Sequence, residues 1–201
     1  MNLTHLLLSV GSIGAASTGV YLTRNSWLPS SESEKTSKKS LSQILMDNKY
    51  KPLDTSKSEK WGEVLKEYKK AYSTEQKTEE QLRNECKLLL DKEDFVSEDY
   101  KRARRWCIES QSVSKRLEFF GKKALSTVES ESRDDNDWKT KISNHNQASN
   151  NKLGDNFGNS ETQNLKDIKD KCKVLNAKTN TDDNFDDDFS KSMAWCSVAS
   201  S

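Results

Sequence analysis

Four cysteines are the side chains of this 201-residue sequence with the clearest capacity for covalent chemistry. They are Cys86, Cys107, Cys172 and Cys196. The second and the fourth each directly follow a tryptophan, and the first and the third precede these pairs at similar distances. An even number of cysteines at matched positions favours two disulfides, Cys86–Cys107 and Cys172–Cys196. Each cysteine also falls on an apolar helical stripe, so a small buried side chain without a bond is the alternative.

A simple helix geometry argues against these bonds. If one helix ends near residue 91 and the next begins near residue 98, Cys86 and Cys107 are staggered by about 6 Å along the axes. Added to a gap of about 8–10 Å between helices, this stagger exceeds the limit of about 7 Å on the Cα separation of a disulfide. A tilted crossing would restore the bond, so the sequence leaves both interpretations open.

The histidines do not complete a recognisable site with these cysteines. His5 lies in the apolar N-terminal segment and His145 in a polar stretch that we expect to be a loop. The cysteines are at least 21 residues apart without a Cys-x-x-Cys pair, which argues against zinc. Nothing near His145 marks an activated thiol. We therefore predict no catalytic, cofactor-binding or metal-binding residues, no cofactor, and no enzymatic activity.

Two charged runs resemble a calcium-binding loop and a nucleic-acid contact, but residues in or beside each run argue against such a site. The acidic run at residues 182–189 alternates like a calcium loop, but Asp187 stands where that loop needs glycine and Met193 where it needs glutamate. We expect a helix N-terminus there, where acids favour the helix dipole. The run "YKRARRW", residues 100–106, resembles a nucleic-acid contact. Acidic neighbours on both sides favour an exposed helix face, so we predict neither a nucleic-acid partner nor a small-molecule substrate.

The composition favours helices to position these residues. Hydrophobic and charged residues each make up 32% of the chain, with only seven glycines and two prolines, and the net charge is +1. Apolar residues recur at helical spacing in five stripes. These stripes span residues 61–72, 82–90, 100–107, 165–175 and 185–196. Capping boxes are expected at Thr78 with Gln81 and at Ser160 with Gln163. We predict an all-α fold without a sheet.

The helices are arranged as two copies of one pattern, residues 41–110 and 111–201. Each copy has a short apolar segment, a turn around Leu-Asp/Ser-Thr, a tryptophan, a cysteine helix and a closing Trp-Cys pair. The opening segments are Leu41, Ile44 and Leu45 in one copy and Leu117, Phe119 and Phe120 in the other. The turns are Leu53–Thr55 and Leu125–Thr127. The tryptophans expected in the core are Trp61, Trp106, Trp138 and Trp195.

The N-terminal segment, residues 1–23, has the features of a membrane anchor. Residues 6–22 are apolar or small and reach the minimum length for a helix that contacts membrane lipid across a bilayer. Gly14 and Ala16 would also suit signal-peptide cleavage before Ser17, but no Lys or Arg precedes the segment, which favours an uncleaved single-pass anchor. Residues 24–40 form a polar linker. The basic residues that follow the span favour a cytoplasmic side for the repeats, although most lie far from it.

The order of these motifs resembles the paralogous families of uncharacterised proteins from haemotrophic mycoplasmas. The phrases "PLDTSKSEKW" and "RRWC" carry the resemblance, whereas the second copy departs from it at Ser126. The resemblance implies a surface-displayed protein of the cell membrane, with extracellular repeats and a part in host interaction or antigenic variation through an unknown host or protein partner. The alternative is a membrane-tethered helical scaffold on the cytoplasmic side, and a secreted enzyme is a third hypothesis.

The anchor generates a first prediction. Because residues 6–22 carry no charge and are long enough to span a bilayer, the protein should stay with membranes through a high-salt wash followed by a carbonate wash. Fractionation and immunoblotting measure this directly. Recovery of the intact, uncleaved chain in the soluble fraction would contradict the anchor.

Overall fold

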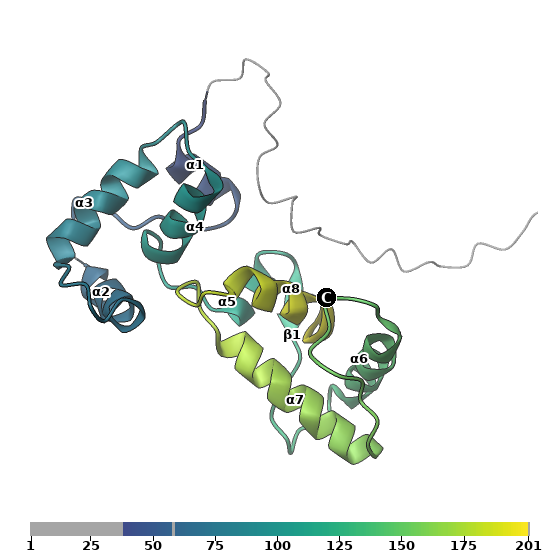
Figure 1. Cartoon of the computed structure of the whole chain (residues 1–201). Coiled ribbons are helices and arrows are strands. Elements are labelled where there is room, and N and C mark those ends of the chain that lie inside the picture. Colours follow the sequence, from purple (N-terminus) through teal and green to yellow (C-terminus); the bar gives the residue numbers. More distant parts are fainter. Residues whose placement is uncertain (1–37, 58, 201) are drawn as a thin grey trace, which may run out of the picture.

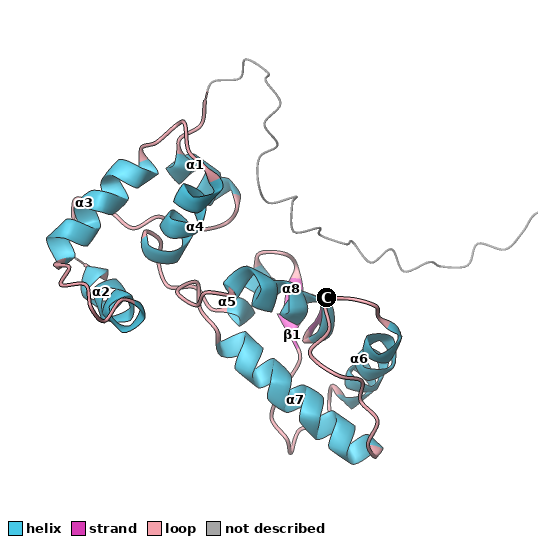
Figure 2. Ribbon diagram, viewed as in Figure 1, coloured by secondary structure: helices cyan, strands magenta, loops and turns pink. Residues whose placement is uncertain are grey.

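The computed structural model describes residues 38–57 and 59–200, which form two groups of short helices (Figure 1). The expected anchor at residues 6–22 and nearly all of the linker lie outside these residues. Within them, no helix is long and apolar enough to cross a membrane. The described chain is mostly helical, as the composition predicts (Figure 2).

The helices follow one order in both halves. The first half contains α1 (Leu41–Asp47), α2 (Trp61–Ala71), α3 (Glu79–Leu90) and α4 (Ser97–Trp106). The second half contains α5 (Val113–Glu118), β1 (Lys122–Ala124), α6 (Asp135–Gln147), α7 (Glu161–Ala177), α8 (Phe185–Trp195) and β2 (Ser197–Ala199). Thus α1 corresponds to α5, α2 to α6, α3 to α7 and α4 to α8.

Hydroxyl side chains fix where these helices begin. The Ser40 and Ser112 side chains accept backbone N–H groups at the starts of α1 and α5, which satisfies donors that have no partner inside the helix. The predicted capping box of Thr78 and Gln81 is confirmed at α3. At α7 the Ser160 side chain accepts the Gln163 N–H, but the predicted box is incomplete because the Gln163 side chain donates to Asp167 instead. The acidic run begins α8, with three aspartates in the first turn, as expected.

Matching hydrogen bonds show that the two halves share one scaffold. The Trp61 indole donates to the Asp54 carbonyl at 3.0 Å, and the Trp138 indole donates to the Ser126 carbonyl at 3.1 Å. Each acceptor belongs to the turn that precedes the tryptophan helix, so the turn and the helix are held together in the same way. The opening segments, however, align Leu41 with Val113 rather than with Leu117, because α1 and α5 each begin one residue after their serine cap.

The prediction of a fold without a sheet is wrong. Strands β1 and β2 pair antiparallel, with Ala124 opposite Ser197 and Lys122 opposite Ala199. The first half has a single bridge at the equivalent place, between Pro52 and Ile108. Proline has no N–H to donate and limits strand pairing, so the shorter pairing in the first half follows from the sequence. Helical periodicity does not reveal strands of three residues.

Both disulfides form, between Cys86 and Cys107 and between Cys172 and Cys196. Their Cα separations are 5.3 and 5.5 Å, within the range that a disulfide allows. The stagger estimate fails because it places the second cysteine inside a helix. Cys107 and Cys196 are instead the C-cap residues of α4 and α8, where the chain leaves the helix.

The predicted tryptophans are all buried, with exposed fractions between 0 and 9%. Trp61 and Trp106 lie in one hydrophobic cluster, and Trp138 and Trp195 lie in a second. The first cluster also takes in side chains of α5 and α8, from beyond residue 110. They are Val113, Leu117, Phe185 and Phe189. The two halves therefore share part of one core.

The basic run of α4 joins the halves, so the expectation of an exposed helix face is wrong for part of it. Arg104 is only 3% exposed and donates to the Asn180 carbonyl at 3.0 Å. The Asn180 amide donates to the carbonyls of Arg104 and Arg105 and accepts the Gln111 N–H. These bonds offset the burial of most polar atoms of the network, whereas the Arg104 Nε is buried without a hydrogen bond to a described residue.

Trp61 provides a test of the repeat scaffold. The free energy of unfolding should fall by about 3–5 kcal/mol in Trp61→Ala, because a fully buried ring is removed. Trp61→Phe keeps most of the packing and should lose about 1–3 kcal/mol, because the Asp54 carbonyl loses its donor. Urea unfolding measures both values. The control Leu88→Ala, at a side chain 72% exposed on α3, should change stability by no more than about 0.5 kcal/mol; equal effects at the two positions would contradict the scaffold.

Candidate binding cleft

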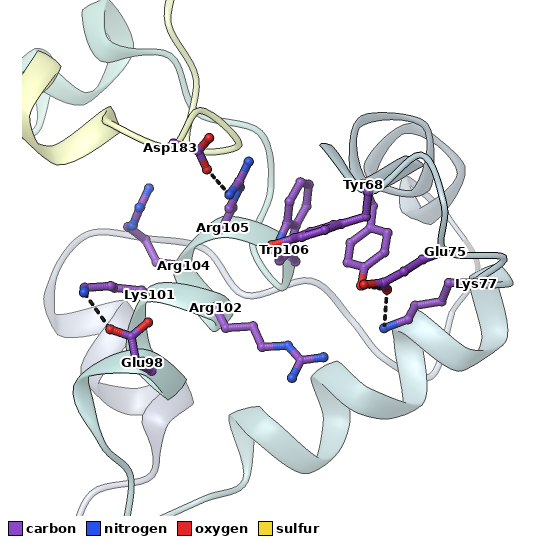
Figure 3. A pocket seen from close by; sticks show the side chains of 11 residues that line it. Tyr68, Glu75, Lys77, Glu98, Lys101, Arg102, Arg104, Arg105, Trp106 and Asp183 are labelled. Carbon is purple, nitrogen blue, oxygen red and sulfur yellow. Dashed lines mark hydrogen bonds and ion pairs between the residues drawn. The ribbon is translucent and has the colours of Figure 1, made fainter. Parts of the chain in front are cut away.

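A cleft of about 510 Å³ opens in the first half between α2, the 72–77 connection and α4 (Figure 3). Its lining combines aromatic rings with charged side chains. The lining residues are Tyr68, Tyr72, Glu75, Lys77, Glu98, Lys101, Arg102, Arg104, Arg105, Trp106 and Asp183. Ten come from the first half, and Asp183 reaches in from the loop that precedes α8.

Aromatic rings form one wall of the cleft. The Tyr68 and Trp106 rings meet edge to face, with centroids 5.0 Å apart, and the Tyr72 ring lies 4.7 Å from Tyr68. The Arg105 guanidinium lies 4.6 Å from the Trp106 ring centre and the Lys77 ammonium lies 4.7 Å from that of Tyr68. Such cation–π contacts hold the cations against the rings.

In two ion pairs of the cleft the acid is more exposed than the cation, although the Lys101 side chain is itself 56% exposed. The Arg105 side chain is 17% exposed, and it donates to the Thr181 carbonyl and pairs with Asp183, which is 78% exposed. Lys101 pairs with Glu98 at 2.7 Å, and that glutamate is 79% exposed. Exposed ion pairs contribute about 0–1 kcal/mol, so these acids are replaceable partners.

Two titratable side chains of the cleft, Tyr68 and Lys77, keep their protons at neutral pH. Burial and then the hydrogen bond to Glu75 raise the pKa of Tyr68 above its ordinary value. Burial opposes the charge on Lys77, but its bonds to Glu85 and Tyr68 outweigh this effect and raise the pKa of Lys77. A tyrosine and a lysine that remain protonated are poor bases. The cleft is suited to binding an anionic or aromatic group.

The same position in the second half is filled by the chain itself. His145, expected in a loop, is a fully buried residue of α6. Its Nε2 accepts the Leu153 N–H at 2.9 Å, and its ring contacts Phe157 and Trp195. The polar stretch after α6 therefore folds back over the helix that precedes it. The sequence did not reveal this burial, because Leu153 and Phe157 are isolated apolar residues without a period.

The cysteines and the possible metal ligands do not form a reactive or metal-binding site within the described residues. All four cysteines are in disulfides. Within residues 38–57 and 59–200, no group of three or more His, Cys, Asp or Glu side chains has the arrangement that holds a metal ion. The cleft was not predicted from the sequence, because its residues come from α2, α4 and two loops. The one sequence signal for it is the position of Arg105 beside Trp106.

Comparison with known proteins gives no relative. No protein-family model matches the chain, and neither the curated proteins nor the solved structures contain a match.

Buried His145 generates a prediction about pH. Burial lowers the pKa of His145, and the charges of Lys152 and Lys171 act in the same direction. Below about pH 6.5 the unfolded chain takes up a proton that the folded chain does not. The contribution of His145 to stability should therefore be constant above that pH and fall as the pH decreases, by at most about 1.4 kcal/mol per unit, until the folded pKa is reached.

Urea unfolding of the protein and of His145→Phe at several pH values measures this contribution. The stability difference between the two proteins should shrink or reverse as the pH falls from 7.5 to 5. A difference that does not depend on pH would show that His145 does not titrate differently in the folded chain.

Proposed function

We propose that this chain is a non-enzymatic binding protein, tethered to a membrane by residues 6–22, whose two repeats face the oxidising side. The observation that carries the proposal is the pairing of all four cysteines in two equivalent disulfides. The cleft between α2 and α4 is its interaction site, and a protein is its partner.

The disulfides support an oxidising location. Such bonds persist outside the cell and are rare in a reducing cytosol. Each joins cysteines 21 or 24 residues apart, which stabilises the fold by roughly 3 kcal/mol in the chain-entropy model. That amount is a large part of the stability of a small domain, so repeats built in this way depend on a compartment where the bonds last.

The lining of the cleft supports binding to a protein. Tyrosine, tryptophan and arginine are the residues most enriched at the centres of protein interfaces, and all three types line this cleft. Tyr72 remains 37% exposed although its ring contacts Tyr68 and Trp106. An exposed tyrosine beside buried rings and arginines provides apolar area together with hydrogen-bond donors.

The alternative, a helical scaffold on the cytoplasmic side, is favoured by the basic residues that follow the expected span. The nearest is Arg24, and the next, Lys35, lies 13 residues past Leu22, so this charge signal is weak. Two structural disulfides count against a cytosolic location. The resemblance to the mycoplasma families, with its implied role in host interaction or antigenic variation, stays a prediction because no comparison identifies the family.

Protease and thiol labelling test the location together. In intact cells, added protease should remove residues 41–201. Protein purified and unfolded without reductant should react with an alkylating reagent at none of its four cysteines, and at all four once reductant is added. Repeats that are protected in intact cells and carry four reactive thiols would contradict the proposal and favour the cytoplasmic scaffold.

A further inference from the structure

The two repeats place equivalent residues around the cleft and around its filled counterpart. Tyr68 and His145 each lie seven positions after the first tryptophan of their repeat, and each meets the Trp of the Trp-Cys pair edge to face at 5.0 Å. Lys101 and Ser190 each lie five positions before that second tryptophan. Tyr68, Lys101 and Trp106 therefore correspond to His145, Ser190 and Trp195.

In the second repeat, one irregular segment contacts all three counterparts. The Asn151 carbonyl accepts the Trp195 indole N–H at 2.5 Å, and the Asn151 amide donates to the Ser190 hydroxyl at 3.3 Å. The Leu153 N–H donates to His145 at 2.9 Å. The backbone of Asn151 and Leu153 and the Asn151 side chain thus bond to the positions that line the open cleft of the first repeat.

The first repeat lacks this segment. Six residues, 72–77, connect α2 to the cap of α3, whereas twelve residues, 148–159, connect α6 to the cap of α7. The Trp106 indole N–H, unlike that of Trp195, makes no hydrogen bond to any residue that the structure describes. Glu75 and Lys77 cover part of Tyr68 with side chains only, and the rest of the space is the cleft.

We propose that the cleft of the first repeat binds a short segment of a partner polypeptide without regular secondary structure, in the place that residues 151–157 take in the second repeat. The partner segment presents a backbone carbonyl to the Trp106 indole, an apolar side chain to Tyr68 and Tyr72, and a carboxylate to Lys101 and Arg105. This proposal specifies the partner of the proposed function and rests on it for the cleft being a site of interaction.

The charge of the site favours an acidic segment. Lys101 and Arg105 correspond to Ser190 and Ala194 in the second repeat, so the cations belong to the open cleft and not to the shared scaffold. Their acidic partners Glu98 and Asp183 are 79 and 78% exposed. A carboxylate from a ligand can replace them at little cost, because exposed ion pairs contribute little to stability.

The experiment uses the chain's own segment as the probe. A fluorescent synthetic peptide with the sequence of residues 149–158 and the change Lys152→Glu is titrated with the full-length oxidised protein in detergent, and anisotropy is recorded. We expect saturable binding. Lys101→Glu in the protein should weaken it at least tenfold. The matched control Lys87→Glu, an exposed lysine of α3 outside the cleft, should change it less than twofold.

A second peptide and a second variant separate recognition from attraction between charges. Replacement of Leu153 and Phe157 of the peptide by serine should abolish binding, and Trp106→Phe in the protein should weaken it, because the indole donor is lost. No saturable binding, or equal binding by the serine peptide, or equal weakening by Lys87→Glu would overturn the proposal. Peptide binding does not depend on the side of the membrane that the repeats occupy. The binding test can therefore fail while the protease test succeeds, and the protease test can fail while the binding test succeeds.

Discussion

The bond between a cysteine inside one helix and a cysteine at the C-cap of the next is the constraint on which each repeat depends. It holds the end of α4 against α3 and the end of α8 against α7. Because the capping cysteine directly follows a tryptophan, the same bond sets that ring against Tyr68 of α2 or His145 of α6. The carbonyl of the capping cysteine then accepts the N–H of Leu53 or Leu125 at 2.9 Å, which ties the early turn to the end of the repeat.

The two repeats share this disulfide-linked arrangement, but they differ in the connection after the tryptophan helix and in the charge of the last helix. The first keeps a short connection after α2, an open cleft and a basic α4, and that helix also binds the second repeat through Arg104 and Asn180. The second has a longer connection that covers His145 and Trp195. One scaffold therefore supports an open aromatic surface in one copy and a closed core in the other.

The sequence predicted the features that repeat at regular spacing. The apolar stripes of α2, α3 and α4, the cap at Thr78 and the buried tryptophans all follow from local pattern. It could not predict the short strands, because three residues carry no period. Nor could it predict the burial of His145, because Leu153 and Phe157, which cover it, are isolated apolar residues in a polar stretch. The disulfides were left open since a distance between helix axes says little about a residue at a helix end.

The pairing of the cysteines tests the central claim most directly. Digestion of the purified chain without reductant, followed by mass spectrometry of the linked peptides, identifies each partner. The account predicts two linked pairs, Cys86 with Cys107 and Cys172 with Cys196, and no others. Links between the repeats, such as Cys86 with Cys172, or four unlinked cysteines in protein isolated under conditions that block thiol exchange, would contradict it.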